Sequence, residues 1–219
     1  MKGKFERALA IIFAVLAFCG NAPLRAGIPS DLGTWNHITV IKPIGKYYAM
    51  ARLEHRSYEN VGATEAAFAM AGAGYYFSKW LQGDVSYEYW KIPAAGDIVC
   101  HKAVFCLTGT LRRDILAVSL KEKYELAVNA GEGDPYGTLR TRLRAQVSPE
   151  GFFMKPYVIS EFFNGFSGTG WIRSLHYVGA DIPICKGNTL DVYYMYHLYN
   201  KGGSVASCNV LGLGYTLVF

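Results

Sequence analysis

Hydrophobic and polar residues alternate along most of the chain from residue 46 onward, in segments of about ten residues. The clearest segment is TLRTRLRAQV, in which small and apolar side chains fall on one face and Arg140, Arg142 and Arg144 on the other. A period of two is typical of a β-strand, because successive side chains point to opposite faces. About ten residues is also the length with which a tilted strand crosses the hydrocarbon of a bilayer. The pattern therefore predicts an all-β chain of membrane-length strands.

The fold expected from these segments is a single antiparallel transmembrane β-barrel over residues 46–219. Residues 27–45 form an N-terminal lead-in or an extra strand, with its candidate at 35–41. Antiparallel closure with both ends on one side requires an even number of strands, so ten strands are favoured and twelve are the alternative. The predicted strands are 46–56, 66–77, 82–90, 98–107, 112–126, 138–147, 152–163, 171–181, 188–198 and 206–219.

The segments between these strands alternate between longer and shorter linkers when they are counted back from the C-terminus. YNKGGSVAS and NAGEGDPYGT are long, whereas PICKG and SPEG are short. Bacterial outer-membrane barrels have short periplasmic turns and longer outer loops. The linkers therefore agree with a barrel whose C-terminus lies on the periplasmic side.

The last strand ends in an aromatic residue after alternating apolar and tyrosine positions. Leu213, Tyr215, Leu217 and Phe219 lie on one face of CNVLGLGYTLVF. This ending resembles the signal by which outer-membrane barrels are recognised for insertion. We therefore expect the barrel-assembly machinery and outer-membrane lipid as partners of the chain.

The first 26 residues have the pattern of a cleaved signal peptide. MKGKFER is cationic, ALAIIFAVLAF is an uncharged apolar run too short to span a bilayer, and Ala26 precedes the expected cleavage site. Export to the outer membrane is the predicted localisation. Removal of this segment also changes the charge, because the formal +5 of the chain falls to 18 basic against 16 acidic residues. With a nearly neutral remainder and no phosphate-binding glycine loop, a nucleic-acid partner is not expected.

Four stretches, taken in order, resemble a known family. They are DLGTWNHITVIKPI, LTGTLRRDILAVSLKEKYELAV, LRTRLRAQV with KPYVISEFF, and VLGLGYTLVF. Together they are similar to the domain-of-unknown-function family twenty-four-ninety, a group of exported, barrel-like proteins. The resemblance covers most of residues 31–219 and implies a barrel at the cell envelope, without an activity. The chain departs from the family pattern around HKAVFC, where Cys100 and Cys106 flank a strand.

The polar faces of the predicted strands would line the lumen with eight basic and six acidic side chains. One interpretation is structural, because small barrels fill their interior with side chains. The other is a narrow pore or binding barrel, because rings of Arg or Lys favour anions. The predicted lumen residues are Arg52, Glu54, Arg56, Asp84, Glu88, Lys121, Lys123, Glu125, Arg140, Arg142, Arg144, Glu161, Arg173 and Asp191.

Two other classes of function remain open from the sequence. Ser174 and His176 share one strand face and are the candidate pair of a lipid-modifying enzyme, an acyl hydrolase or transferase. A third catalytic group cannot be identified from the sequence. A soluble periplasmic lipocalin-like carrier is the other alternative, and its barrel would turn the apolar face inward. No cofactor is indicated, the separate histidines lack metal-ligand spacing, and the small-molecule ligand is unknown.

The cysteines of the predicted mature chain do not suggest a simple pairing. Cys100 and Cys106 on one strand would lie about 20 Å apart, which is too far for a disulfide. Cys185 and Cys208 would lie near opposite ends of the barrel. A link between Cys100 and Cys208 at one rim is the pairing left open.

Overall fold

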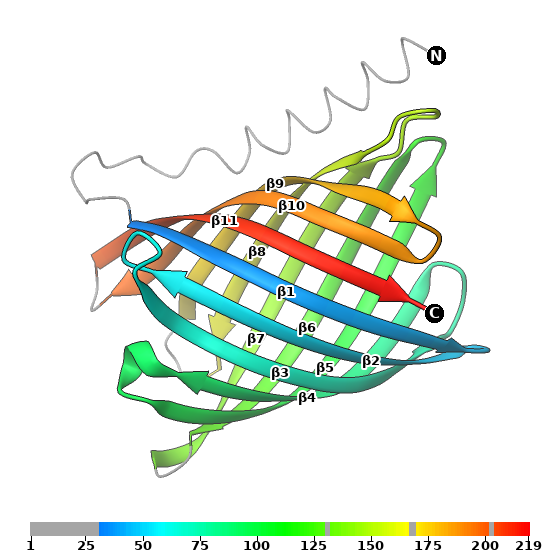
Figure 1. Cartoon of the computed structure of the whole chain (residues 1–219). Coiled ribbons are helices and arrows are strands. Elements are labelled where there is room, and N and C mark those ends of the chain that lie inside the picture. Colours follow the sequence, from blue (N-terminus) through cyan, green and yellow to red (C-terminus); the bar gives the residue numbers. More distant parts are fainter. Residues whose placement is uncertain (1–30, 130–131, 167–169, 202–203) are drawn as a thin grey trace.

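The structure is a computed structural model and describes residues 31–129, 132–166, 170–201 and 204–219; the predicted signal peptide lies outside these ranges. The described residues form eleven strands that close into a barrel, with one short 3-10 helix, η1 (Figure 1). The elements are β1 (Asp31–Ile44), β2 (Tyr47–Tyr58), β3 (Ala63–Tyr76), β4 (Leu81–Ile92), η1 (Pro93–Ala95), β5 (Ile98–Arg113), β6 (Leu116–Asn129), β7 (Glu132–Val147), β8 (Lys155–Gly165), β9 (Gly170–Cys185), β10 (Asn188–Lys201) and β11 (Ser204–Val218).

Each strand from β1 to β10 pairs antiparallel with the next one in the sequence, and a parallel pair of β1 with β11 closes the barrel. In Figure 1 the β1 strand, blue, lies between the red β11 and the cyan β2. The register of the closing pair runs from Asp31 opposite Cys208 to Ile41 opposite Val218. We call this pair of strands the seam. The amide of Phe219 extends it by donating to the carbonyl of Ile41 at 3.2 Å.

The number of strands corrects the sequence prediction of ten, with twelve as the alternative. The extra-strand candidate at 35–41 lies within β1, which has no additional partner strand and pairs directly with β11. An even number is required only when every pair is antiparallel. A parallel ladder also satisfies the backbone groups of both edges, so an odd-numbered barrel closes without an exposed edge.

All ten predicted strands are present, but most are longer than predicted. The ladder between β10 and β11 continues until Lys201 pairs with Ser204, inside the predicted long linker. By contrast, the connection 148–154 after β7 includes a segment predicted to be short. The predicted alternation of long and short linkers is therefore wrong. Backbone pairing continues beyond the apolar part of a strand, because the ladder does not require apolar side chains.

The two faces of the barrel wall differ in chemistry. Large apolar side chains point outward, and they keep between 48% and 63% of their surface exposed at Ile38, Leu53, Val85, Phe105, Leu120 and Leu211. Charged side chains such as Glu54, Glu88 and Glu125 are buried on the inner face. This arrangement is the reverse of the one that a lipocalin-like carrier would need. Within the described part of the chain, no helix is long and apolar enough to cross a membrane.

Glycines on the inner face leave room for large aromatic side chains from neighbouring strands. Gly212 on β11 is opposite Tyr193 on β10, and a Cβ at this glycine would overlap the tyrosine ring. By contrast, a Cβ at Gly109 on β5 would meet nothing within 4 Å. The absence of a side chain at Gly212 therefore allows Tyr193 to lie flat across the inner wall.

Candidate functional site

Glu125 on β6 is the centre of the largest ion-pair group in the lumen. It accepts from Arg140 and lies 3.2 Å from Lys123 Nζ and 3.3 Å from Lys102 Nζ. The side chain of Glu125 is only 4% exposed. A buried carboxylate is stable only when it is paired and hydrogen-bonded, and three cations from β5, β6 and β7 supply these contacts.

The same cations extend the group to two more carboxylates. Lys123 lies 3.0 Å from Glu88 on β4, and Arg140 lies 2.8 Å from Glu161 on β8. Trp90 also donates its indole N–H to Glu88 at 2.8 Å. The group therefore crosses five neighbouring strands, from β4 to β8, and ties one side of the barrel together.

A second group lies on β2 and fills the lumen near the start of β1. Glu54 accepts from both Arg52 and Arg56, the latter at 2.7 Å. The guanidinium carbon of Arg56 lies 3.7 Å from the ring centre of Trp35 and 4.7 Å from that of Trp90. Phe68 stacks on Trp90 with ring centres 4.2 Å apart. We call Trp35, Arg56, Phe68 and Trp90 the aromatic plug.

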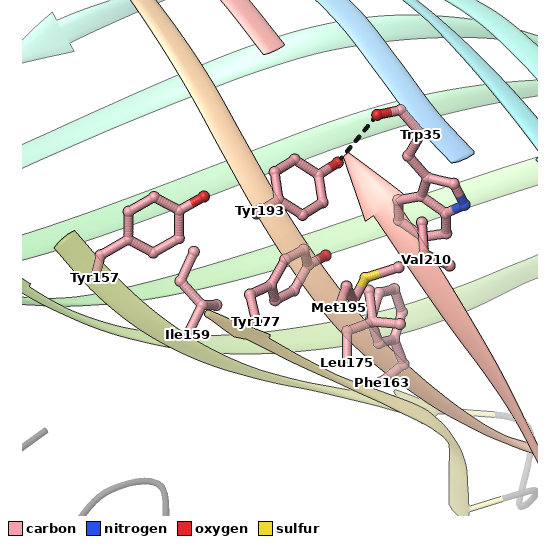
Figure 2. Close-up of a cluster of buried hydrophobic side chains, with 9 residues drawn as sticks. All are labelled: Trp35, Tyr157, Ile159, Phe163, Leu175, Tyr177, Tyr193, Met195 and Val210. Atoms are coloured by element: carbon pink, nitrogen blue, oxygen red, sulfur yellow. Dashed lines mark hydrogen bonds between the residues drawn. The ribbon is translucent and has the colours of Figure 1, made fainter. Parts of the chain in front are cut away.

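The opposite wall of the lumen, on β8 to β11 and β1, is mostly aromatic and aliphatic. Figure 2 shows this cluster, in which Tyr157, Tyr177 and Tyr193 come from three successive strands. The Tyr193 hydroxyl on β10 donates to the Trp35 carbonyl on β1 at 3.5 Å, and this bond crosses β11 (Figure 2). Tyr157 donates to Asp191 at 2.5 Å. The lumen thus has one charged wall and one aromatic wall.

Between these walls lies a cavity of about 470 Å³. Its lining extends to Thr189 and Thr216, near the rim at which β11 ends. Toward the other rim it ends at the aromatic plug, beyond which buried Cys100 and Ala127 pack against Trp90. We call this cavity the vestibule.

Two cations in the vestibule stand outside the ion pairs that the described residues form. Among the described residues, neither Arg142 nor Lys121 forms a salt bridge, and Arg142 Nε has no hydrogen-bond acceptor. The guanidinium carbon of Arg142 lies 5.6 Å from the Tyr177 ring. Neighbouring Arg144, by contrast, is paired with Asp181 at 2.6 Å. Glu161 is opposite Arg142 in the β7–β8 register, but its carboxylate is paired with Arg140. An anion that enters the vestibule can therefore meet Arg142 and Lys121 without displacing a salt bridge.

The structure places most of the predicted lumen residues around the vestibule. Those in its lining are Arg52, Glu54, Arg56, Asp84, Glu88, Lys121, Lys123, Arg140, Arg142, Arg144, Glu161 and Asp191. Glu125 lies behind them in its ion-pair group, and Arg173 lies with its guanidinium carbon 4.1 Å from the Phe163 ring centre. Sequence reasoning missed Lys102 and Asp181. Alternation could have found Lys102, since it shares a strand face with Cys100 and Cys106.

The candidate catalytic pair of Ser174 and His176 lies on the outer face of β9. His176 Nδ1 is 3.2 Å from the hydroxyl of Ser160 on β8, and no hydrogen bond joins it to Ser174 among the described residues. A serine nucleophile needs a base in reach and a third group that orients the base. Among the described contacts of His176, the others are with aromatic Phe162, which cannot serve as that third group.

None of the four described cysteines is part of a disulfide, and a metal site is not formed by any group of three His, Cys, Asp or Glu side chains in the described ranges. Cys100 Sγ lies 3.9 Å from the Tyr136 hydroxyl. The Cys100–Cys208 link left open by the sequence is therefore not present. The predicted insertion residues Leu213, Tyr215 and Phe219 are exposed on the outer face at the end of the seam.

A closed, single-layer barrel with a charged interior and an apolar exterior defines a porin-like β-barrel. The chain belongs to the family described as "Protein of unknown function (DUF2490)", whose model matches residues 32–207. No curated protein sequence matches it. Among solved structures it is similar to the NanC porin in its rhombohedral crystal form, with a TM-score of 0.52 and 8% identity. That likeness covers 86% of this chain and 99% of the porin, and it concerns the fold alone.

Proposed function

We propose that this chain is an outer-membrane β-barrel whose vestibule binds small anions. The observation that carries the proposal is the presence of Arg142 and Lys121 in the vestibule lining without a salt bridge among the described residues. A buried cation that makes no salt bridge is costly, and a bound anion would offset this cost. The aromatic wall opposite, with Tyr157 and Tyr177, adds an apolar surface for the body of such a ligand.

Placement in the outer membrane is supported by the chemistry of the outer face and by the ends of the sequence. Exposed side chains such as Leu53 and Leu120 suit contact with lipid, and a closed barrel satisfies every backbone group there. The N-terminal segment has the pattern of a signal peptide, and Phe219 ends a strand with the pattern of an insertion signal. Fractionation with outer membrane and heat-modifiable gel mobility are the expected results. Recovery as a soluble protein without detergent would contradict the placement.

Anion binding is tested by calorimetric titration of the refolded protein in detergent with inorganic phosphate as the probe. We expect saturable binding that Arg142→Gln weakens about tenfold or more, because hydrogen bonds to a charged donor are lost. Lys91→Gln is the matched control, since Lys91 has a side chain 57% exposed away from the vestibule. Equal heats for the wild type, Arg142→Gln and Lys91→Gln would refute an anion site at Arg142.

A further inference from the structure

The outer face of the barrel carries an acidic side chain at the middle of a strand. Glu122 lies on β6, a strand of 14 residues from Leu116 to Asn129, and points away from the lumen. Its Oε2 accepts from the Thr141 hydroxyl on β7 at 2.9 Å. Within the described ranges, other charged outward side chains such as Lys42 and Lys91 lie within two residues of a strand end. Glu122 is therefore unusual among these charged residues because it lies near the middle of its strand.

A second polar pair lies on the same outer face of the barrel, two and three strands away from Glu122. Ser160 on β8 and His176 on β9 are opposite each other and are joined through the ring Nδ1 at 3.2 Å. Both residues are also near the middle of their strands. The second ring nitrogen of His176 and Oε1 of Glu122 take part in no described hydrogen bond. One acceptor and one nitrogen thus remain available on an otherwise apolar face.

These groups are costly if hydrocarbon alone covers them. Charged side chains on the lipid face destabilise barrels most strongly at the midplane, although less for Glu than for Arg or Lys, and an intramembrane ionisable group suggests a specific partner. One hydroxyl from Thr141 satisfies a single oxygen of the carboxylate. A hydrogen-bond donor on a second protein surface would satisfy the other oxygen, Oε1 of Glu122.

We propose that the outer face of β6 to β9 packs against the same face of a second copy of this chain. In this dimer, Glu122 of each copy accepts a hydrogen bond from His176 of the other. The proposal rests on the membrane placement given above and is independent of anion binding. The partner is a second copy of this chain because the outer face of β6 to β9 is complementary to itself.

Self-complementarity follows from the positions of the acid and the base. Glu122 and His176 lie on β6 and β9, at the two edges of a patch three strand spacings wide, about 14 Å. A two-fold axis between β7 and β8 exchanges these edges, so each acid faces a base and the contact forms twice. Between them, Leu143 and Phe162 are outward-facing and supply apolar contact near the axis.

The test is the mass of the protein in detergent micelles, measured by size-exclusion chromatography with light scattering. We expect a dimer for the wild type. Glu122→His and His176→Glu should each give a monomer, because like groups then face each other. The double variant Glu122→His with His176→Glu should restore the dimer, since the pair is exchanged and not removed. Val85→His, on the outer face of β4, is the control and should remain dimeric.

Two results would overturn the proposal: a monomeric wild type, or a double variant that stays monomeric. Heat-modifiable gel mobility is recorded for every variant, so that a failure to form the barrel is separated from a failure to associate. A soluble, non-barrel wild type would refute the membrane placement as well. A folded, membrane-inserted monomer would refute the dimer alone.

Discussion

The guanidinium group of Arg56 lies against the ring of Trp35, with 3.7 Å between the guanidinium carbon and the ring centre. It also lies 4.7 Å from the centre of the Trp90 ring, so that one side chain fills the space between two indoles from β1 and β4. Cation–π contacts of this kind contribute most when they are desolvated. This contact closes the vestibule on the side toward the start of β1.

Shortening Arg56 should therefore open the lumen. We expect Arg56→Ala to raise the single-channel conductance of the refolded protein in a planar bilayer severalfold, since it removes the side chain that fills the aromatic plug. Lys91→Ala, on the outer face, should leave the conductance unchanged. If Arg56→Ala and the wild type are equally silent while both remain folded, the plug is not the barrier.

The charge of the vestibule should set the selectivity of the opened lumen. In the Arg56→Ala background, Arg142→Glu should shift the reversal potential in a KCl gradient toward cation preference, because rings of Arg or Lys favour anions and carboxylates favour cations. Arg142→Lys keeps the charge and should keep the preference. An identical reversal potential for Arg142→Glu and Arg142→Lys would show that ions do not pass this residue.

The ion-pair group around Glu125 should be important for stability. Glu125→Gln leaves Lys102, Lys123 and Arg140 near one another without their shared carboxylate. Removing one member of a buried charge group costs about 3–5 kcal/mol. We expect a loss of this size in the free energy of unfolding by urea, followed by tryptophan fluorescence in micelles. Glu150→Gln, in the exposed connection after β7, should change it little, and equal effects would contradict the assignment.

The close approach of Tyr193 to Gly212 gives a prediction about packing. Gly212→Ala places a Cβ on the tyrosine ring and should cost about 1–3 kcal/mol of unfolding free energy, as overpacking does. Gly109→Ala, which meets nothing within 4 Å, is the control. Adding Tyr193→Leu to Gly212→Ala should recover part of the loss. No recovery would mean that the ring does not occupy this position.

The local alternation of apolar and polar residues allowed the strands to be predicted, because a period of two indicates which side chains point into the lumen and which point outward. Arg140, Arg142 and Arg144 follow this rule on β7, whereas Glu122 breaks it on the apolar face of β6. The alternation carries no information about which strand pairs with which, so the parallel seam was not predicted.

Contacts between side chains on different strands could not be predicted from the sequence either. Ser174 and His176 share a strand face and were read as a pair, but the register places Ser160 opposite His176. Similarly, Arg144 meets Asp181, a residue two strands away that was not assigned to the lumen. These contacts depend on register and on barrel curvature, which a single sequence does not encode locally.

The seam has a consequence for the order in which the barrel can fold. Asp31 pairs with Cys208, and Ile41 with Val218, so closure joins the first described strand to the last. Contacts between residues so far apart in the sequence have a high entropic cost of loop closure, and they therefore form slowly. Until Ser204–Val218 is in place, β1 and β10 each keep an unpaired edge that invites aggregation. A chain interrupted before its final strand would therefore be the form most in need of a chaperone.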